Sequence, residues 1–144
     1  LIGTWFAEAL LRLGRTQEAL QMAKEVLGQA KKSESRWFLY LAHTILGRIL
    51  SQGDALDQGA AQAHLESALQ QAEQMHSRPF QGQSAFILGE FLSHRCAGRS
   101  ESENKITASH ARAYLTQAAN ICKSVGMHAD SERAQTALTQ LSPH

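Results

Sequence analysis

The chain has 144 residues, the length of one domain spanning 1–144, with 43% apolar and 19% charged residues. Its 14 basic and 13 acidic residues leave a net charge of +1, which does not favour binding to nucleic acid. Two cysteines are too few for a disulfide framework, and no apolar run approaches the roughly 20 residues of a membrane span. These properties predict a cytoplasmic protein with reduced thiols and no membrane contact.

Helical periodicity dominates the chain, and no alternation of period two lasts long enough for a strand. Thr16 and either Ser33 or Ser35 are candidate N-caps, Pro79 suits the first turn of a helix, and Gly126 suits a helix end. The sequence therefore predicts an all-α fold with helices at about residues 2–13, 16–31, 35–52, 57–76, 79–97, 106–124 and 130–141.

Two patterns recur at a spacing of about forty residues. The first is a leucine–glycine pair followed by another leucine, seen as Leu46-Gly47…Leu50 and Leu88-Gly89…Leu92, and degraded to Phe6-Ala7…Leu10. The second is an alanine cluster, seen as Ala61/Leu65/Ala68 and Ala111/Leu115/Ala118. Because a small residue in mid-helix lets a second helix approach closely, we expect Gly47 and Gly89 at helix crossings. Gly47→Leu should clash there, whereas Gly89→Ala should be mild because Ala7 holds the equivalent position.

These residues resemble the tetratricopeptide repeat (TPR), and the resemblance covers nearly the whole chain. It implies a right-handed α-α superhelix of about three helix pairs, over about residues 1–33, 34–77 and 78–126, with a capping helix at about 129–141. The repeat unit is longer than the usual 34 residues or so. The tryptophan of the family pattern is replaced by Gly3, His43 and Ala85.

The long repeats are similar to those at the C-terminal end of bacterial signalling ATPases, which include maltose-regulator-like transcription activators and adenylate-cyclase-linked ATPases. The segment Ala111–Ala118 and the ending Val125-Gly126-Met127 carry this similarity. It implies a non-catalytic protein–protein interaction scaffold that serves as the C-terminal regulatory module of a larger bacterial signalling or transcription-regulatory protein. The apolar start at Leu1 also suggests a fragment of a longer protein. The alternative is a free-standing peptide-binding adaptor.

In tetratricopeptide arrays the first helix of each pair lines a concave groove. The resemblance implies that a protein or peptide partner, or another domain of the parent chain, binds there. The implied groove residues are Thr4, Glu8, Arg12, Thr44, Arg48, Gln52, Gln83, Phe86, Glu90 and His94. The middle positions, Glu8, Arg48 and Glu90, mix charges and lack the lysine and asparagine of the arrays that clamp chaperone tails.

No residues have the spacing of a catalytic or metal site, so we predict neither an enzyme nor a cofactor. His94, Cys96, His110 and Cys122 could be imagined as zinc ligands, but their spacing fits no common zinc pattern. A cysteine–histidine nucleophile pair from these residues would lack a third, orienting group. No glycine-rich phosphate-binding loop occurs either.

The last third of the chain yields two further expectations. Residues 99–105, after Gly98, contain no apolar side chain, which predicts a polar loop outside the packed helices that could be replaced without changing the melting temperature. The final helix should instead cover the sixth near Leu115 and Ala118, so deleting 129–144 should lower stability sharply. Its apolar stripe consists of Ala134, Ala137, Leu138 and Leu141.

Overall fold

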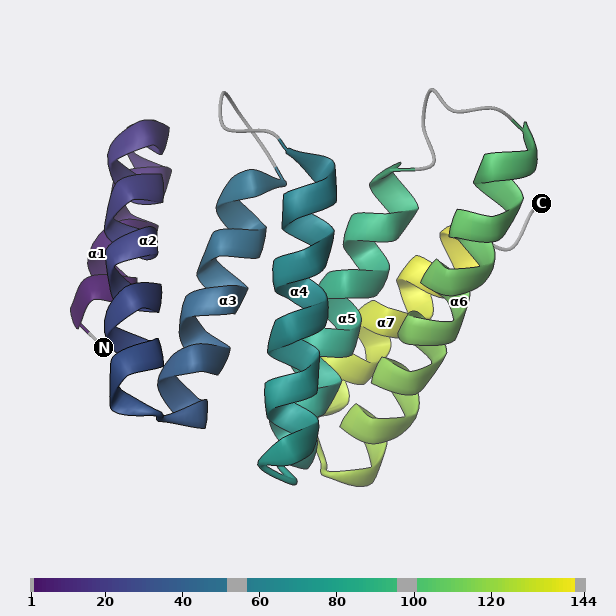
Figure 1. Cartoon of the computed structure of the whole chain (residues 1–144). Coiled ribbons are helices and arrows are strands. Elements are labelled where there is room, and N and C mark those ends of the chain that lie inside the picture. The colour runs from purple at the N-terminus through teal and green to yellow at the C-terminus, as the bar shows by residue number, and fades with distance from the viewer. Residues whose placement is uncertain (1, 52–56, 96–100, 142–144) are drawn as a thin grey trace. The chain divides into compact units, whose positions relative to one another are not determined.

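The computed structural model describes residues 2–51, 57–95 and 101–141, and these ranges contain seven helices and no strand (Figure 1). The helices are α1 (Ile2–Arg12), α2 (Thr16–Ser33), α3 (Arg36–Leu50), α4 (Gln58–Gln74), α5 (Arg78–Arg95), α6 (Glu101–Ser124) and α7 (His128–Leu141). The predicted all-α class is confirmed for this part of the chain. None of these helices is long and apolar enough to cross a membrane.

The chain divides into two compact units, Leu1–Met75 and His76–His144. The first unit holds α1 to α4 and the second holds α5 to α7. The helix pairs of the three expected repeats are thus all present, with α1–α2 and α3–α4 in the first unit and α5–α6 in the second. Their superhelical arrangement stays a prediction.

The helix ends agree with the sequence at most positions. Ser35 is the N-cap of α3, where its hydroxyl accepts a hydrogen bond from the Phe38 amide at 3.3 Å. Gly126 ends α6 with a φ of 81°, a left-handed conformation that glycine adopts without strain. The N-cap predicted for α2 is wrong, because Arg15 holds that position without a side-chain cap bond. Thr16 is instead the first helical residue, and its side chain is buried.

The start of α6 contradicts the predicted polar loop. Residues 101–105 are helical, while 99 and 100 lie outside the described residues. Extending an existing helix adds one hydrogen bond for each residue ordered, so a polar segment needs no buried side chain of its own. Glu103 also lies in the first turn, where a negative charge interacts favourably with the helix dipole. The predicted exposure holds, since Glu103 and Lys105 are exposed and even Ile106 is 63% exposed.

In the first unit each helix packs against the next along the chain, and α1 also contacts α3. The residues that fill this core are alanines on α2, an alanine and a leucine on α1, and larger aliphatic residues on α3. They are Ala7, Leu10, Ala19, Ala23, Ile45, Leu46 and Ile49. Contact between α1 and α3 places two first helices of successive pairs side by side, an arrangement that positions the charged residues described below.

In the second unit α5 packs against α6, and α7 packs against α6 with a smaller contact to α5. Ala134 of α7 is fully buried, and the Ser131 hydroxyl donates a hydrogen bond to the Ala119 carbonyl at 3.0 Å. The prediction that α7 covers α6 is thus confirmed. The buried part of α7 consists of Ser131 and Ala134, whereas Leu138 and Leu141 are only half-buried.

Two glycines lie where paired helices cross, as predicted. A Cβ on Gly47 of α3 would lie 2.5 Å from Cδ2 of Leu65 in α4. A Cβ on Gly89 of α5 would lie 2.7 Å from Cγ and 3.1 Å from the backbone nitrogen of Leu115 in α6. Both distances are below those of ordinary van der Waals contact. In both pairs, α3–α4 and α5–α6, the two helices approach closely because a leucine side chain packs directly on a glycine.

This geometry contradicts the expectation that Gly89→Ala is mild. In the first pair Ala7 replaces the glycine, but the residue that corresponds to Leu65 and Leu115 is Ala23, which is also buried. Both alanines belong to the buried core, and together they have a smaller volume than a glycine and a leucine. Because Leu115 is larger than Ala23 and its backbone lies close, an added methyl group at residue 89 has no room.

We predict that Gly89→Ala lowers the free energy of unfolding by about 1–3 kcal/mol, measured by chemical denaturation. Gly28→Ala on α2 is the matched control, since nothing lies within 4 Å of a Cβ there. It should instead raise stability by about 0.5–1 kcal/mol. In a Leu115→Ala background the penalty at residue 89 should shrink, because the pair then matches Ala7 and Ala23. An equal penalty in both backgrounds would contradict the crossing.

We also predict that Ala134→Glu destabilises the second unit by about 3 kcal/mol or more, because it buries a carboxylate without a partner between α7 and α6. Gln135→Glu, at the exposed neighbouring position, should change the free energy of unfolding by no more than about 0.5 kcal/mol. Thermal and chemical denaturation of both variants provide the test. Similar stabilities for the two variants would show that α7 does not cover α6.

Candidate functional site

Three of the predicted groove residues meet on the first unit, at the contact between α1 and α3. The carboxylate of Glu8 lies 3.2 Å from Nη1 of Arg48 and 3.7 Å from Nη2 of Arg12. The side chain of Glu8 is 32% exposed and that of Arg48 is 50% exposed. Ion pairs this exposed add little stability. Their main effect is on the local charge, because the carboxylate of Glu8 is neutralised by two cations, Arg12 and Arg48.

The other predicted residues of the first unit contribute less. The hydroxyl of Thr44 donates a hydrogen bond of 2.7 Å to the Tyr40 carbonyl of its own helix, so it is already satisfied. Thr4 belongs to α1, but its side chain and the whole of Gln52 lie outside the described residues. The first unit thus presents an ion-paired face and not an open site at these positions.

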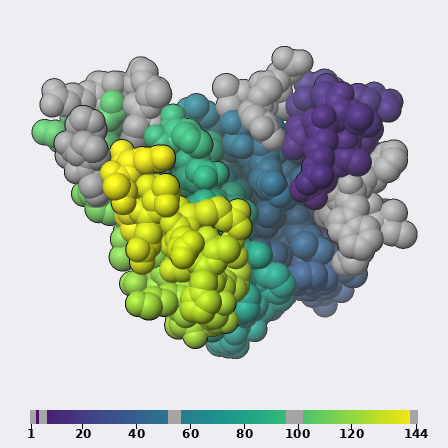
Figure 2. All heavy atoms as spheres, turned by 180° about the vertical axis from the view of Figure 1, so that it is seen from behind, coloured from purple at the N-terminus to yellow at the C-terminus, as the bar shows by residue number. Residues whose placement is uncertain are grey.

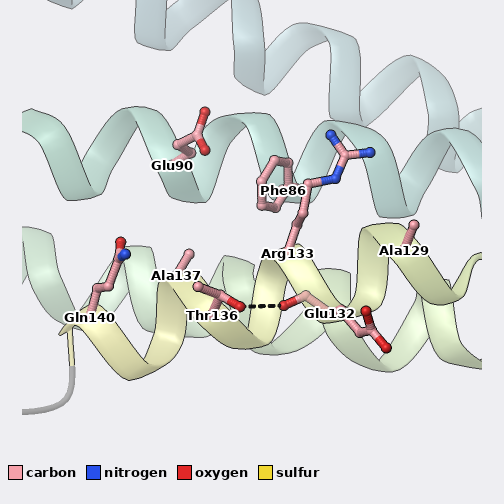
Figure 3. A pocket seen from close by; sticks show the side chains of 8 residues that line it. All are labelled: Phe86, Glu90, Ala129, Glu132, Arg133, Thr136, Ala137 and Gln140. Carbon is pink, nitrogen blue, oxygen red and sulfur yellow. Dashed lines mark hydrogen bonds between the residues drawn. The ribbon is translucent and has the colours of Figure 1, made fainter.

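The second unit holds an open groove of about 480 Å³ between α5 and α7, and Phe86 and Glu90, two predicted residues, line its α5 side (Figure 3). Its volume falls in the range of ligand-binding clefts. The α7 side had not been predicted as part of a site. It consists of Ala129, Glu132, Arg133, Thr136, Ala137 and Gln140.

The α7 residues of this groove recur every three or four positions, so they share one face of the helix. That spacing is the sequence signal that could have identified them. It was missed because α7 was interpreted only as a cap for α6. The helix performs both roles, with Ser131 and Ala134 buried and the neighbouring face directed to the groove. Figure 2 shows α7, in yellow tones, on the surface of the second unit.

The groove combines an aromatic wall with charged and polar rims. Phe86 is half-buried, and Figure 3 shows Arg133 reaching from α7 towards it. Arg133 forms an ion pair with Asp130 on its own helix. The Thr136 hydroxyl donates to the Glu132 carbonyl at 2.9 Å, which leaves the Glu132 carboxylate at the groove. Such a surface can hold a ligand by apolar contact and charge.

Gln83 and His94, the remaining predicted residues, are also on α5 but are exposed and do not line this groove. His94 lies in the last turn of the helix, beyond the end of the groove. Of the four residues predicted on α5, the structure therefore brings together Phe86 and Glu90 and leaves the other two outside.

A pair of histidines that the sequence analysis did not identify joins α3 to α4. Nδ1 of His43 lies 2.9 Å from Nδ1 of His64, and the ring centroids are 5.2 Å apart. At this distance one nitrogen donates a proton to the other, so the pair is joined as neutral imidazoles. The crossing of Gly47 with Leu65 explains the contact, since His43 lies one turn before Gly47 and His64 directly precedes Leu65.

The surroundings keep this histidine pair neutral. Burial lowers the pKa of His43 from 6.5 to about 4, with further contributions from the positive charges of His64 and Lys31. The pKa of His64 is also lowered, first by burial and then by Lys31. A further proton on the pair would place a positive charge at this partly buried site and near Lys31.

The cysteines and the remaining histidines assemble no chemical centre in the part of the chain that the structure describes. No group of three His, Cys, Asp or Glu residues is close enough there to hold a metal ion. Cys122 is fully buried opposite Gly82, and burial raises the pKa of its thiol, an effect that Asp130 reinforces. His110 is exposed, and Cys96 lies outside the described residues.

We predict that the histidine pair makes the first unit sensitive to acid. Because the folded pKa of His43 lies below 6.5, the unfolded chain binds more protons between about pH 6.5 and pH 4. Stability should therefore fall as the pH falls through this window. Compared with the wild type, His43→Gln should lose about 1 kcal/mol less over this range, a figure reduced for solvent screening.

The matched control for this pH effect is His110→Gln, which replaces an exposed histidine on α6. Its pH profile of unfolding free energy should parallel that of the wild type. A His43→Gln profile that also parallels the wild type would show that the pair does not couple to folding.

Comparison of the sequence with models of known protein families and with curated proteins gives no match. What the site can do is therefore derived from its own residues. The groove between α5 and α7 offers one aromatic ring, two carboxylates and several polar groups, a combination suited to binding.

Proposed function

We propose that this protein is a non-catalytic protein–protein interaction module, and that a segment of a partner protein binds in the groove between α5 and α7. One observation carries the proposal: Phe86 and Glu90, expected at a ligand groove from the repeat pattern, line an open groove of about 480 Å³. The aromatic ring supplies an apolar contact, and polar side chains on both rims supply hydrogen-bonding groups.

The shape of the groove favours a peptide segment as ligand. Its two walls are helices that run beside one another. Groove residues extend over several turns of α7, from Ala129 to Gln140, and over about one turn of α5, from Phe86 to Glu90. An elongated site with exposed rims suits an extended chain or a helix laid along it.

The finer assignment is also a proposal. The helix pairs are divergent tetratricopeptide repeats in a right-handed superhelix, which the similar glycine–leucine crossings at Gly47/Leu65 and Gly89/Leu115 support. The resemblance of the sequence favours a cytoplasmic C-terminal regulatory module of a larger bacterial signalling or transcription-regulatory protein over a free-standing adaptor. A reading frame that extends upstream into an ATPase domain would support the module, and a start codon near Leu1 would support the adaptor.

We predict that the full chain selects peptides from a displayed random library and that Phe86→Ser weakens their binding about thirtyfold, since Phe86 is the aromatic residue among the described residues that line the groove. Phe38→Ser is the matched control, because Phe38 is a partly exposed aromatic residue of the first unit. It should leave binding unchanged. Dissociation constants by fluorescence anisotropy, and thermal melts to verify folding, complete the test.

Either of two results would contradict this function. The library could yield no peptide that binds the folded chain, or Phe38→Ser could weaken the selected peptides as much as Phe86→Ser does. In the second case binding would depend on the surface around Phe38, which lines a different cavity, together with Val26 and Leu41.

A further inference from the structure

The groove between α5 and α7 carries uncompensated negative charge. Its lining includes the carboxylates of Glu90 and Glu132 and one cation, Arg133. Arg133 is already in an ion pair with Asp130. No ion pair joins Glu90 or Glu132 to another residue in the part of the chain that the structure describes. The groove and Asp130 together therefore hold three acids and one base.

The first unit shows how the same position looks when its charge is balanced. Glu8 directly follows Ala7 as Glu90 directly follows Gly89, so the two glutamates hold equivalent positions in their repeats. Glu8 lies between Arg12 of its own helix and Arg48 of the next first helix. On the second unit, α7 presents Glu132 and Thr136 to the groove beside the already paired Arg133. Among the described residues, Glu90 has no ion pair that corresponds to those of Glu8 with Arg12 and Arg48.

The apolar part of the groove suits the stem of a long basic side chain. Phe86 is half-buried, and Figure 3 shows Arg133 opposite it, with the small Ala129 and Ala137 on either side of Arg133 along α7. An arginine or lysine carries its charge at the end of an apolar stem, and a guanidinium also packs favourably on an aromatic ring. Arginine on the partner can then form charge-assisted hydrogen bonds to a carboxylate at the rim.

We infer that the partner segment is basic, and that its arginine side chains lie against Phe86 and pair with Glu90 on α5 and Glu132 on α7. This inference rests on the proposed function and specifies the partner by its charge. Glu90 belongs to α5 and Glu132 to α7, and Figure 3 shows the Glu132 carboxylate on the side of α7 that faces away from α5, so a long basic side chain has to reach over α7 to pair with it.

The test uses the full chain and three fluorescein-labelled peptides of equal length, in which arginine, glutamine or glutamate alternates with leucine. The arginine peptide should bind more tightly than the other two. Glu90→Gln/Glu132→Gln should weaken its binding about tenfold, and added salt should weaken wild-type binding more than variant binding. Both glutamates are exposed, so the double variant should keep the wild-type melting temperature.

The matched control is Glu73→Gln, which removes an exposed carboxylate of α4 in the first unit. It should leave binding of the arginine peptide unchanged. An equal loss in this control, or an unchanged affinity in Glu90→Gln/Glu132→Gln, would overturn the inference, because attraction would then arise from the general charge of the surface.

The remaining outcomes separate this inference from the proposed function. If the glutamine or glutamate peptide binds most tightly and Phe86→Ser abolishes its binding, the basic partner is wrong but the groove still binds peptides. If no peptide binds and sedimentation shows a dimer that Phe86→Ser dissociates, a second copy of the chain occupies the groove and the inference is overturned. If no peptide binds to a monomeric chain, both proposals are overturned.

Discussion

The close crossing of paired helices is the constraint on which the rest of the structure depends. In α3–α4 and α5–α6 a glycine without a side chain lets a leucine of the second helix lie against its backbone. In α1–α2 the equivalent positions are the smaller pair Ala7 and Ala23, and a Cβ on Gly3 would lie 2.5 Å from Cγ2 of Val26. What the three pairs have in common is a small residue on the first helix that lets the second helix approach closely, as expected of close-packed interiors.

The crossing also determines where the candidate site lies. Glu8, Arg48 and Glu90 each directly follow the small residue of a crossing, so each lies about 100° further round its helix. That rotation takes these side chains off the buried stripe, so that they lie beside the close-packed interface of each helix pair. The result is an ion pair between α1 and α3 and a groove wall between α5 and α7.

The two units use this shared geometry differently because their neighbouring helices differ in charge. Where α3 presents Arg48, the carboxylate of Glu8 is neutralised within the fold. Where α7 presents Glu132 and keeps Arg133 paired with Asp130, the carboxylate of Glu90 faces an open groove. Similar helix crossings can thus lead to an internal ion pair in one unit and, as we propose, to a binding surface in the other, because function depends on the site and not on the fold alone.

The sequence by itself determined the helices and the crossings at Gly47 and Gly89, because periodicity within one helix defines its buried stripe and the residues beside it. Phe86 and Glu90 were expected at a groove from the resemblance to tetratricopeptide repeats. The local sequence pattern could not show that α6 includes residues 101–105, since polar residues with intermediate helix propensity become helical when they adjoin an existing helix. The contact of His43 with His64 and the second role of α7 required the tertiary structure. Both depend on the rotation and register of one helix against another, which packing of whole side chains decides and spacing along a single helix does not encode.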